Sequence, residues 1–313
     1  AYARSSAMAL RECEDDTADA VDKLSQQIRD VAALLQETLL WKGFLGTLEE
    51  RYGTAPGTRP FAHMLVLGVG SFATQPCALL QLALAYLLLQ TCITDNTDAE
   101  TGAETALGAE SSRGLGLRGC AEDVSRHRAS GYEPVFTTLE KSVCEALGLD
   151  TSIPNKKGKY KVPATGLPTP CFMPHCPYSL CGSLLWENWE HLRQLVLIGN
   201  SISSYMLRSL PALPPVPEPP FGAEGRPQAT DVLPADCIAL VASAVTEVPL
   251  YKPAYGKTPP PRGTIGQVLI HVERAFNDTC VLWFAPSALL ALPDRPLEAA
   301  VSAWNQTQST EMG

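Results

Sequence analysis

The sequence has no excess of positive charge, because 24 lysines and arginines are outnumbered by 33 aspartates and glutamates, which gives a net charge of −9. Sequence-independent binding of nucleic acid needs clustered lysine and arginine, so we expect no nucleic-acid partner. The longest apolar stretch, at 77–89, is shorter than the roughly 20 residues that cross a bilayer, so we expect no membrane span. With 45% apolar residues, the chain can still bury a sizeable core.

Familiar catalytic and metal-binding motifs are also missing. The sequence contains no G-x-S-x-G nucleophile elbow and no complete Walker A motif. Its ten cysteines lack the regular spacing of a disulfide framework, which indicates a reducing compartment. Cys171, His175, Cys176 and Cys181 are close in sequence, but the first of them lie along an expected strand, whose side chains alternate between faces. We therefore predict buried thiols and no metal site.

Polar residues follow two apolar runs within 170–201, which read as one strand–helix–strand unit. His175 and Cys176 follow the first run, and Gly199, Asn200 and Ser201 end the second. Residues just past the carboxyl ends of parallel strands line the ligand crevice of an open sheet. These five residues are therefore predicted ligand-binding residues. His175 is the best candidate for a general acid or base, although a histidine at a strand end also commonly bonds only to backbone. No residue is assigned as catalytic.

A second candidate element is the apolar run that begins at residue 64 and stops at two glycines. Gly68, Gly70 and Ala73 fit the G-x-G-x-x-A spacing that lets backbone N–H groups approach a phosphate at a helix N-terminus. The helix is expected at 77–90, and we include Ser71 with the two glycines as candidate ligand-binding residues. Alternatively, the glycines only form the turn.

Six segments in the same order resemble the sensitivity-to-red-light-reduced family, also called SRR-like. They span most of the chain, from about residue 60 to residue 284, and they lie at 68–72, 132–136, 171–176, 184–189, 198–202 and 276–284. The resemblance implies an α/β fold. It also implies a regulatory protein of the cytoplasm or nucleus, of the kind linked to red-light signalling, the circadian clock and tetrapyrrole or haem metabolism.

Departures from the family pattern fall at informative positions. Glu133 replaces the usual aspartate, so a carboxylate is kept, and Ile202 replaces phenylalanine. In a doubly wound sheet the turn at 68–71 comes beside residues 173–176, and Glu133 then lies where nucleotide-binding relatives hold a ribose hydroxyl. We therefore add Glu133 to the predicted ligand-binding residues.

The expected fold is α/β, with a Rossmann-like, mainly parallel sheet, flanking helices and an N-terminal helical extension. Strands are expected near residues 64, 132, 171, 195, 246 and 280. We expect the extension and a linker at 1–58, the SRR-like domain at 59–285 and a tail at 286–313. The domain should carry an insertion at 91–130 and a proline-rich loop at 211–234. In the extension, an apolar stripe predicts a helix that weakens or breaks at Gly43 and Gly46.

Three functions from different classes remain open at this point. The first is a regulator that binds a protein partner or a small ligand without turning it over. The second is a Rossmann-type enzyme, active or degenerate, that binds a nucleotide or S-adenosylmethionine. The third is a haem sensor in which His175 or Cys176 ligates iron, since Cys176 precedes a proline. The identity of any cofactor is left open by the sequence.

Overall fold

The computed structural model describes residues 2–52, 59–93, 128–164, 166–209, 234–250, 271–290 and 292. The fold is mixed α/β with seven strands in a mostly parallel sheet, which confirms the expected fold class. The described residues form two compact units. The first contains those up to Pro154 together with 271–275, and the second contains those at 155–250 and from Phe276 onward. The two units are described separately below.

Three parallel strands form the sheet of the first unit, in the order β3-β2-β1. They are β1 (Met64–Leu67), β2 (Ala129–Tyr132) and β3 (Leu149–Asp150). The helix expected at 77–90 is confirmed as α3 (Pro76–Cys92), and α5 (Thr138–Ala146) follows β2. α3 is buried on nearly all sides, which explains why its sequence is apolar without a polar face. β3 was not predicted, because two residues carry no periodic signal.

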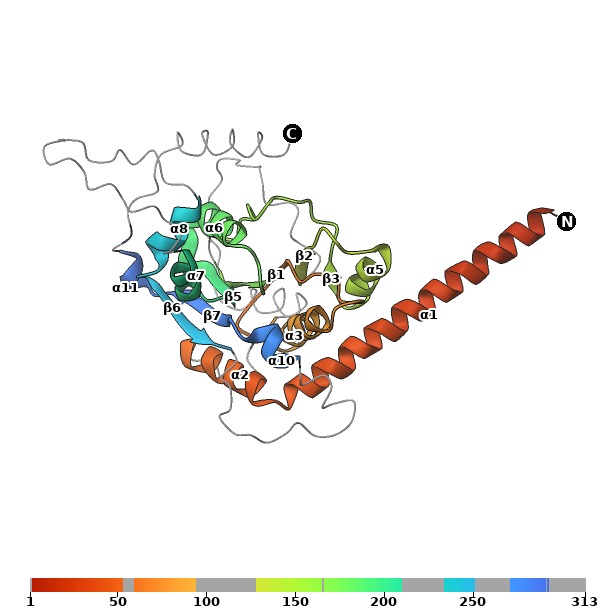
Figure 1. Cartoon of the computed structure of the whole chain (residues 1–313), viewed down its shortest axis with the longest axis horizontal. Helices are drawn as coiled ribbons and strands as arrows, with labels where there is room; N and C mark the ends of the chain where they lie inside the picture. The colour runs from red at the N-terminus through yellow and green to blue at the C-terminus, as the bar shows by residue number, and fades with distance from the viewer. Residues whose placement is uncertain are drawn as a thin grey trace, which may run out of the picture. The chain divides into compact units, whose positions relative to one another are not determined.

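The long helix α1 (Tyr2–Gln36) runs without interruption (Figure 1). Its apolar stripe contains Ile28, Val31 and Leu35, each at most 5% exposed. α1 packs against α3 and α5, so the stripe is buried against its own unit. The buried Gln81 side chain of α3 donates to the carbonyl oxygen of Ala275, in α10 (Val272–Phe276), at 3.1 Å. In the first unit, α1 and α10 thus both contact α3.

The predicted break at Gly43 and Gly46 is wrong. The helix ends at Gln36, and α2 (Leu39–Tyr52) continues through both glycines. Thr38 makes the break, because its hydroxyl donates to the Leu35 carbonyl oxygen at 2.6 Å and accepts from the Trp41 N–H at 3.3 Å. A threonine that caps a helix in this way starts a new helix more effectively than an isolated glycine ends one.

Four strands form the sheet of the second unit, in the order β4-β5-β7-β6. They are β4 (Thr169–Met173), β5 (Leu195–Asn200), β6 (Val245–Pro249) and β7 (Thr279–Phe284). β4 and β5 are parallel, whereas β7 runs antiparallel to both β5 and β6. With β1 and β2, these four strands confirm all six predicted strand positions.

The helices of the second unit lie between and after its strands along the chain (Figure 1). They are α6 (Tyr178–Glu187), the 3₁₀ helix η1 (Trp189–Gln194), α7 (Ile202–Ser209), α8 (Pro234–Val241) and α11 (Pro286–Leu289). No helix among the described residues is long and apolar enough to cross a membrane. The predicted insertion, proline-rich loop and tail lie largely outside the described residues, and the predicted domain boundaries stay predictions.

Candidate functional site

The first predicted site is the turn after β1, which connects that strand to α3. Gly68 and Gly70 have φ angles of 66° and 82°, in the left-handed region that favours glycine. A Cβ atom on Gly70 would meet only the Gln75 side chain at 3.7 Å and the Ala78 Cβ at 3.8 Å, which are ordinary contacts. Glycine at position 70 is therefore required by backbone conformation, and there is room beside it.

Two glutamate side chains accept hydrogen bonds from N–H and hydroxyl groups of this turn. The Gly70 N–H donates to Glu133 Oε2 at 2.9 Å, and the Ala73 N–H donates to Glu140 Oε1 at 3.0 Å. The Ser71 hydroxyl also donates to Glu140 Oε1, at 2.8 Å. A phosphate bound to such a turn would need the same donors and would meet two carboxylates. Glu133 thus has a definite bond within the protein, while the predicted role of these residues in ligand binding stays a prediction.

Glu140 is the residue of this site that the sequence analysis missed. Its side chain is 0% exposed, and its carboxylate accepts four hydrogen bonds, two of them from the N–H and hydroxyl of Thr137 at 2.9 and 3.0 Å. Burial by itself would raise the pKa of Glu140, but the bonds from Thr137, Ala73 and Ser71 outweigh it and hold that pKa below its ordinary value. The available signal was the capping box T-x-x-E at the start of α5, at Thr137 and Glu140.

The second predicted site is the turn after β4, which contains His175 and Cys176. The exposed His175 has a φ of 52°, which is uncommon for a residue other than glycine. The side chain of Asn200, at the end of β5, accepts from the His175 N–H at 2.9 Å and donates to the Cys176 carbonyl oxygen at 3.2 Å. The Tyr205 hydroxyl donates to the same carbonyl at 2.6 Å and accepts from Asn200 at 2.9 Å. Neutral side chains therefore hold this turn by its backbone.

Gly199 brings the backbones of β4 and β5 close together beside that turn. A Cβ atom at position 199 would lie 2.9 Å from the Met173 carbonyl oxygen, closer than real Cβ contacts allow. The Cys176 side chain lies inside the unit at 3% exposure. His175 is therefore an exposed side chain of the turn, and Gly199 has a packing role.

Ser201 directly precedes α7 and caps it. Its hydroxyl accepts from the Ser204 N–H at 3.0 Å and donates to Glu247 Oε2 at 2.8 Å. The other oxygen of Glu247 accepts from the Ser203 N–H at 2.9 Å. Burial, together with Glu247 and Asp278, raises the pKa of the Cys280 thiol to about 12, against a bond from Ser201 that lowers it. Ser201 thus takes the capping role open to a serine at this position.

A half-buried histidine lies before β1, outside both predicted sites. The Nε2 atom of His63 is 3.1 Å from the Ser130 hydroxyl oxygen. Burial lowers the pKa of His63 to about 4, although the nearby Asp150 carboxylate acts in the opposite direction. His63 is therefore neutral near pH 7.

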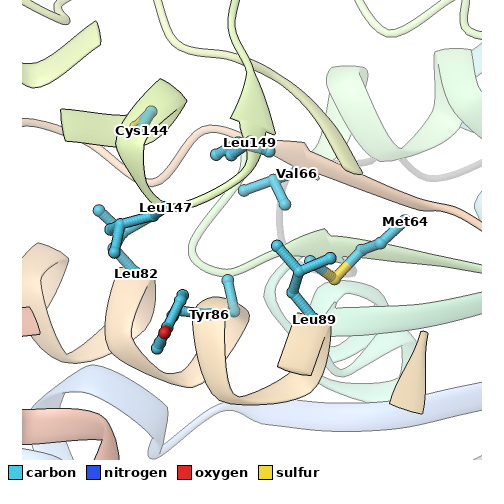
Figure 2. A pocket seen from close by; sticks show the side chains of 9 residues that line it. Met64, Val66, Leu82, Tyr86, Leu89, Cys144, Leu147 and Leu149 are labelled. Atoms are coloured by element: carbon cyan, nitrogen blue, oxygen red, sulfur yellow. The ribbon is translucent and has the colours of Figure 1, made fainter. Parts of the chain in front are cut away.

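Two hollows lie among the described residues of the first unit. One, of about 10 Å³, lies between α3 and the sheet and is lined by nine side chains that are almost all apolar (Figure 2). This volume is about the minimum that a single water molecule needs, so the hollow is a packing gap. The other, of about 290 Å³, lies where α1 meets the start of α3 and is lined by Leu24, Phe72, Gln75 and His271 among others. Its size is at the lower end of small-molecule sites.

Among the residues that the structure describes, no three His, Cys, Asp or Glu side chains are placed to hold a metal ion. Burial raises the pKa of the Cys181 thiol to about 12, and burial and neighbouring Cys181 raise that of Cys171 further. Both thiols therefore stay protonated at neutral pH.

The structure brings the predicted site residues together in two groups. Gly68, Gly70, Ser71 and Glu133 meet in the first unit. The second unit brings together the remaining five, which are His175, Cys176, Gly199, Asn200 and Ser201. That both groups line one crevice stays a prediction.

Comparison with known proteins adds the family context. A family model described as SRR1 domain matches residues 31–283. An SRR1-like protein of Mus musculus is 28% identical over 204 residues, which cover 61% of this chain and 69% of the mouse protein. An SRR1-like protein of Drosophila melanogaster is 40% identical over 72 residues, covering 22% of this chain and 25% of the fly protein.

A plant protein matches a similar length of sequence. It is the Arabidopsis thaliana protein named Sensitivity to Red Light Reduced 1, which is 34% identical over 76 residues, covering 24% of this chain and 26% of the plant protein. No solved structure matches this chain. These matches confirm the resemblance that the six sequence segments carry.

Proposed function

The chain belongs to the SRR1 domain family, and from this premise we propose that it is a regulatory protein that acts by binding rather than by turnover. Its partner is a protein or a small ligand. The proposal extends to the setting that the family resemblance implies, which is red-light signalling, the circadian clock and tetrapyrrole or haem metabolism, in the cytoplasm or nucleus. The name of the Arabidopsis relative supports the first of these.

One observation carries the choice of binding over turnover. In a cofactor-binding enzyme of the Rossmann type, the glycine turn offers free N–H groups to a pyrophosphate. Here the N–H groups of Gly70 and Ala73 donate to the carboxylates of Glu133 and Glu140. A phosphate would have to displace or approach these carboxylates, at a cost in charge repulsion. These hydrogen bonds therefore favour a structural role for the turn over a role in binding phosphate.

The second turn supports the same proposal. Its polar side chains, Asn200 and Tyr205, are bonded to the backbone around Cys176, and Ser201 caps α7. Hydrogen bonds of this kind fix a surface shape, which is what recognition needs. His175 is a titratable residue that this fixed turn exposes to solvent. We therefore place the binding function at the His175 turn.

A thermal-shift screen tests the proposal against the enzyme alternative. Purified protein is heated with ATP, NAD, S-adenosylmethionine or haem, because a ligand that binds only the folded state raises its melting temperature. We expect no shift with the three phosphate or sulfonium cofactors. Any shift with haem should disappear in His175→Ala and persist in Glu133→Gln.

A contrary pattern would overturn the proposal. If ATP, NAD or S-adenosylmethionine raised the melting temperature, and Glu133→Gln changed that shift while His175→Ala did not, the glycine turn would be a cofactor site. Assays for turnover would then follow. The wider setting is tested in the host organism, where loss of the gene should alter tetrapyrrole content or circadian period, and unchanged values of both would contradict it.

A further inference from the structure

The second unit carries a short, strongly basic loop that neither turn uses. Residues 155–161 read Asn-Lys-Lys-Gly-Lys-Tyr-Lys, and we call them the lysine loop. Although the whole chain has a net charge of −9, residues 151–186 contain no aspartate or glutamate. Lys156, Lys157 and Lys161 are exposed, and Lys159 is half-buried. The loop is thus a local positive patch in an acidic protein.

The loop has one defined backbone conformation. The Asn155 side chain accepts from the Lys157 N–H at 2.9 Å, and the Lys159 N–H donates to the Lys156 carbonyl oxygen at 2.9 Å. Lys157 and Gly158 both have positive φ angles, of 51° and 84°, as the two central residues of a type I′ turn do. Lysine is an unusual choice for such a position, where glycine or asparagine fits better.

Contacts with α6 hold the loop in place. Gly158 is buried, and a Cβ atom there would lie 2.8 Å from the Leu180 carbonyl oxygen and 3.0 Å from the Ser183 Cβ. At the end of the loop, the buried Asn188 side chain donates to the Tyr160 carbonyl oxygen at 2.7 Å and accepts from the Val162 N–H at 2.8 Å. The charged side chains therefore extend from a preorganised base.

The positive charges lie close enough to repel one another. Burial lowers the pKa of Lys159, and its neighbour Lys157 lowers it further, against the opposing effect of Glu187. Glu187 also pairs with Lys161 at 3.4 Å. Among the described residues, Glu187 is thus a carboxylate beside Lys159 and Lys161, and an acidic partner would add further negative charge beside the exposed lysines.

We propose that the lysine loop is a docking site for an acidic peptide segment of a protein partner, rich in aspartate or glutamate. A short segment fits the patch, because the four lysines fall within six consecutive residues and electrostatic attraction reaches only about 8 Å, the Debye length at physiological salt. A long polyanion such as RNA would extend onto the rest of a chain whose net charge is −9. The fixed loop reduces the entropy lost on binding. The site gives the proposed regulatory function a class of partner but uses none of the residues of either turn.

Fluorescence anisotropy with a defined probe tests the proposal. The probe is a labelled peptide with six consecutive glutamates flanked by glycines, titrated with the full chain. We expect binding that weakens as salt is raised. The triple variant Lys156→Gln, Lys157→Gln, Lys161→Gln should bind at least tenfold more weakly. The matched control replaces Lys23, Lys42 and Lys141, three exposed lysines of the first unit, by glutamine and should change the affinity less than twofold.

Melting temperatures show whether the variants are folded, and both triple variants should lie within 2 °C of the wild type because exposed lysines contribute little to stability. Equal affinity of the two triple variants would overturn the proposal. It would also be overturned if an RNA oligonucleotide of equal charge bound the lysine loop more tightly than the peptide did. Failure here leaves the proposed function standing, because the thermal-shift screen reads the two turns alone.

Discussion

The two turns that follow β1 and β4 share a backbone with positive φ angles, but different side-chain groups hold them in place. Each must hold a backbone with positive φ angles at the end of a buried parallel strand. The turn after β1 is held by the carboxylates of Glu133 and Glu140, whereas that after β4 is held by the amide of Asn200 and the phenol of Tyr205. The first turn is therefore held by charged acceptors and the second by neutral groups.

Glycine also has a different task at each turn. Gly70 is needed for its φ of 82°, and a Cβ atom there would find room. Gly199 is needed for space, because a Cβ atom would lie 2.9 Å from the Met173 carbonyl oxygen. A glycine in a sequence motif can therefore indicate conformation or close approach, and the pattern alone does not distinguish them.

The stability that the carboxylate hydrogen bonds give to the turn after β1 should depend on pH. The pKa of Glu140 is held below its ordinary value, so its hydrogen bonds stabilise the fold above the pKa of the unfolded chain. That stabilisation is lost as the pH falls through the lowered pKa of the folded state. The amide and phenol at the other turn carry no charge to lose. Two turns with the same backbone requirement therefore respond to acid in different ways.

Among these tests, we expect Glu140→Leu, which removes one of the two carboxylates, to lower the stability most. This change leaves the Ser71 hydroxyl and the N–H groups of Ala73 and Thr137 without their acceptor, so the free energy of unfolding should fall by about 3 kcal/mol. Urea unfolding measures it. Glu145→Leu, at an exposed position of the same helix, should change stability by less than about 0.5 kcal/mol. A loss of similar size in both variants would contradict the role of Glu140.

The next test introduces a charged side chain at the turn after β4. Asn200→Asp removes the donor that reaches the Cys176 carbonyl and the Tyr205 oxygen, and it puts a charge beside both. We expect a loss of about 2 kcal/mol at pH 7, and a smaller loss at pH 3.5 when the new carboxyl is protonated.

Gln194→Glu is the control, because it makes the same change of charge just before β5. Urea midpoints at the two pH values give the comparison. A loss for Asn200→Asp that is identical at both pH values would show that charge plays no part in it.

His63 provides a pH test of the first unit that is independent of Glu140. Its pKa of about 4 in the folded chain lies below the usual 6.5, so the unfolded chain takes up the proton first as the pH falls. Stability should therefore decrease between pH 6.5 and 4, by about 1.5 kcal/mol at pH 5 after allowing for solvent around this half-buried ring. His63→Gln should remove that part of the pH dependence in urea unfolding. An unchanged slope in the variant would mean that His63 titrates normally.

The smallest effects distinguish the two uses of glycine. Gly70→Ala should cost about 1 kcal/mol through its positive φ, and Gly70→Asn less, because asparagine tolerates that region. Gly199→Ala and Gly199→Asn should both be unfavourable, the first by about 1 kcal/mol and the second by more, because a larger side chain meets the same carbonyl. Thermal unfolding of the four variants measures this. Asparagine rescue at both positions would erase the difference.

Much of the fold was predictable because local patterns dominate it. Apolar runs bounded by turn residues placed six of the seven strands, and the apolar stretch after Pro76 placed α3. The helix break was misplaced, since a single hydrogen-bonding threonine, Thr38, outweighed two glycines. The strand β3 was missed because its two residues become a strand only by pairing with β2.

The candidate sites divide in the same way. Hydrophobic periodicity and turn chemistry are properties of neighbouring residues, so the sequence was enough to locate the residues that end the strands. Their partners come from the folded chain: Glu133 and Glu140 accept from the glycine turn, and Asn200 holds the His175 turn. A hydrogen bond between residues 63 positions apart, as between Gly70 and Glu133, depends on the packing of strands and helices, and no local pattern specifies it.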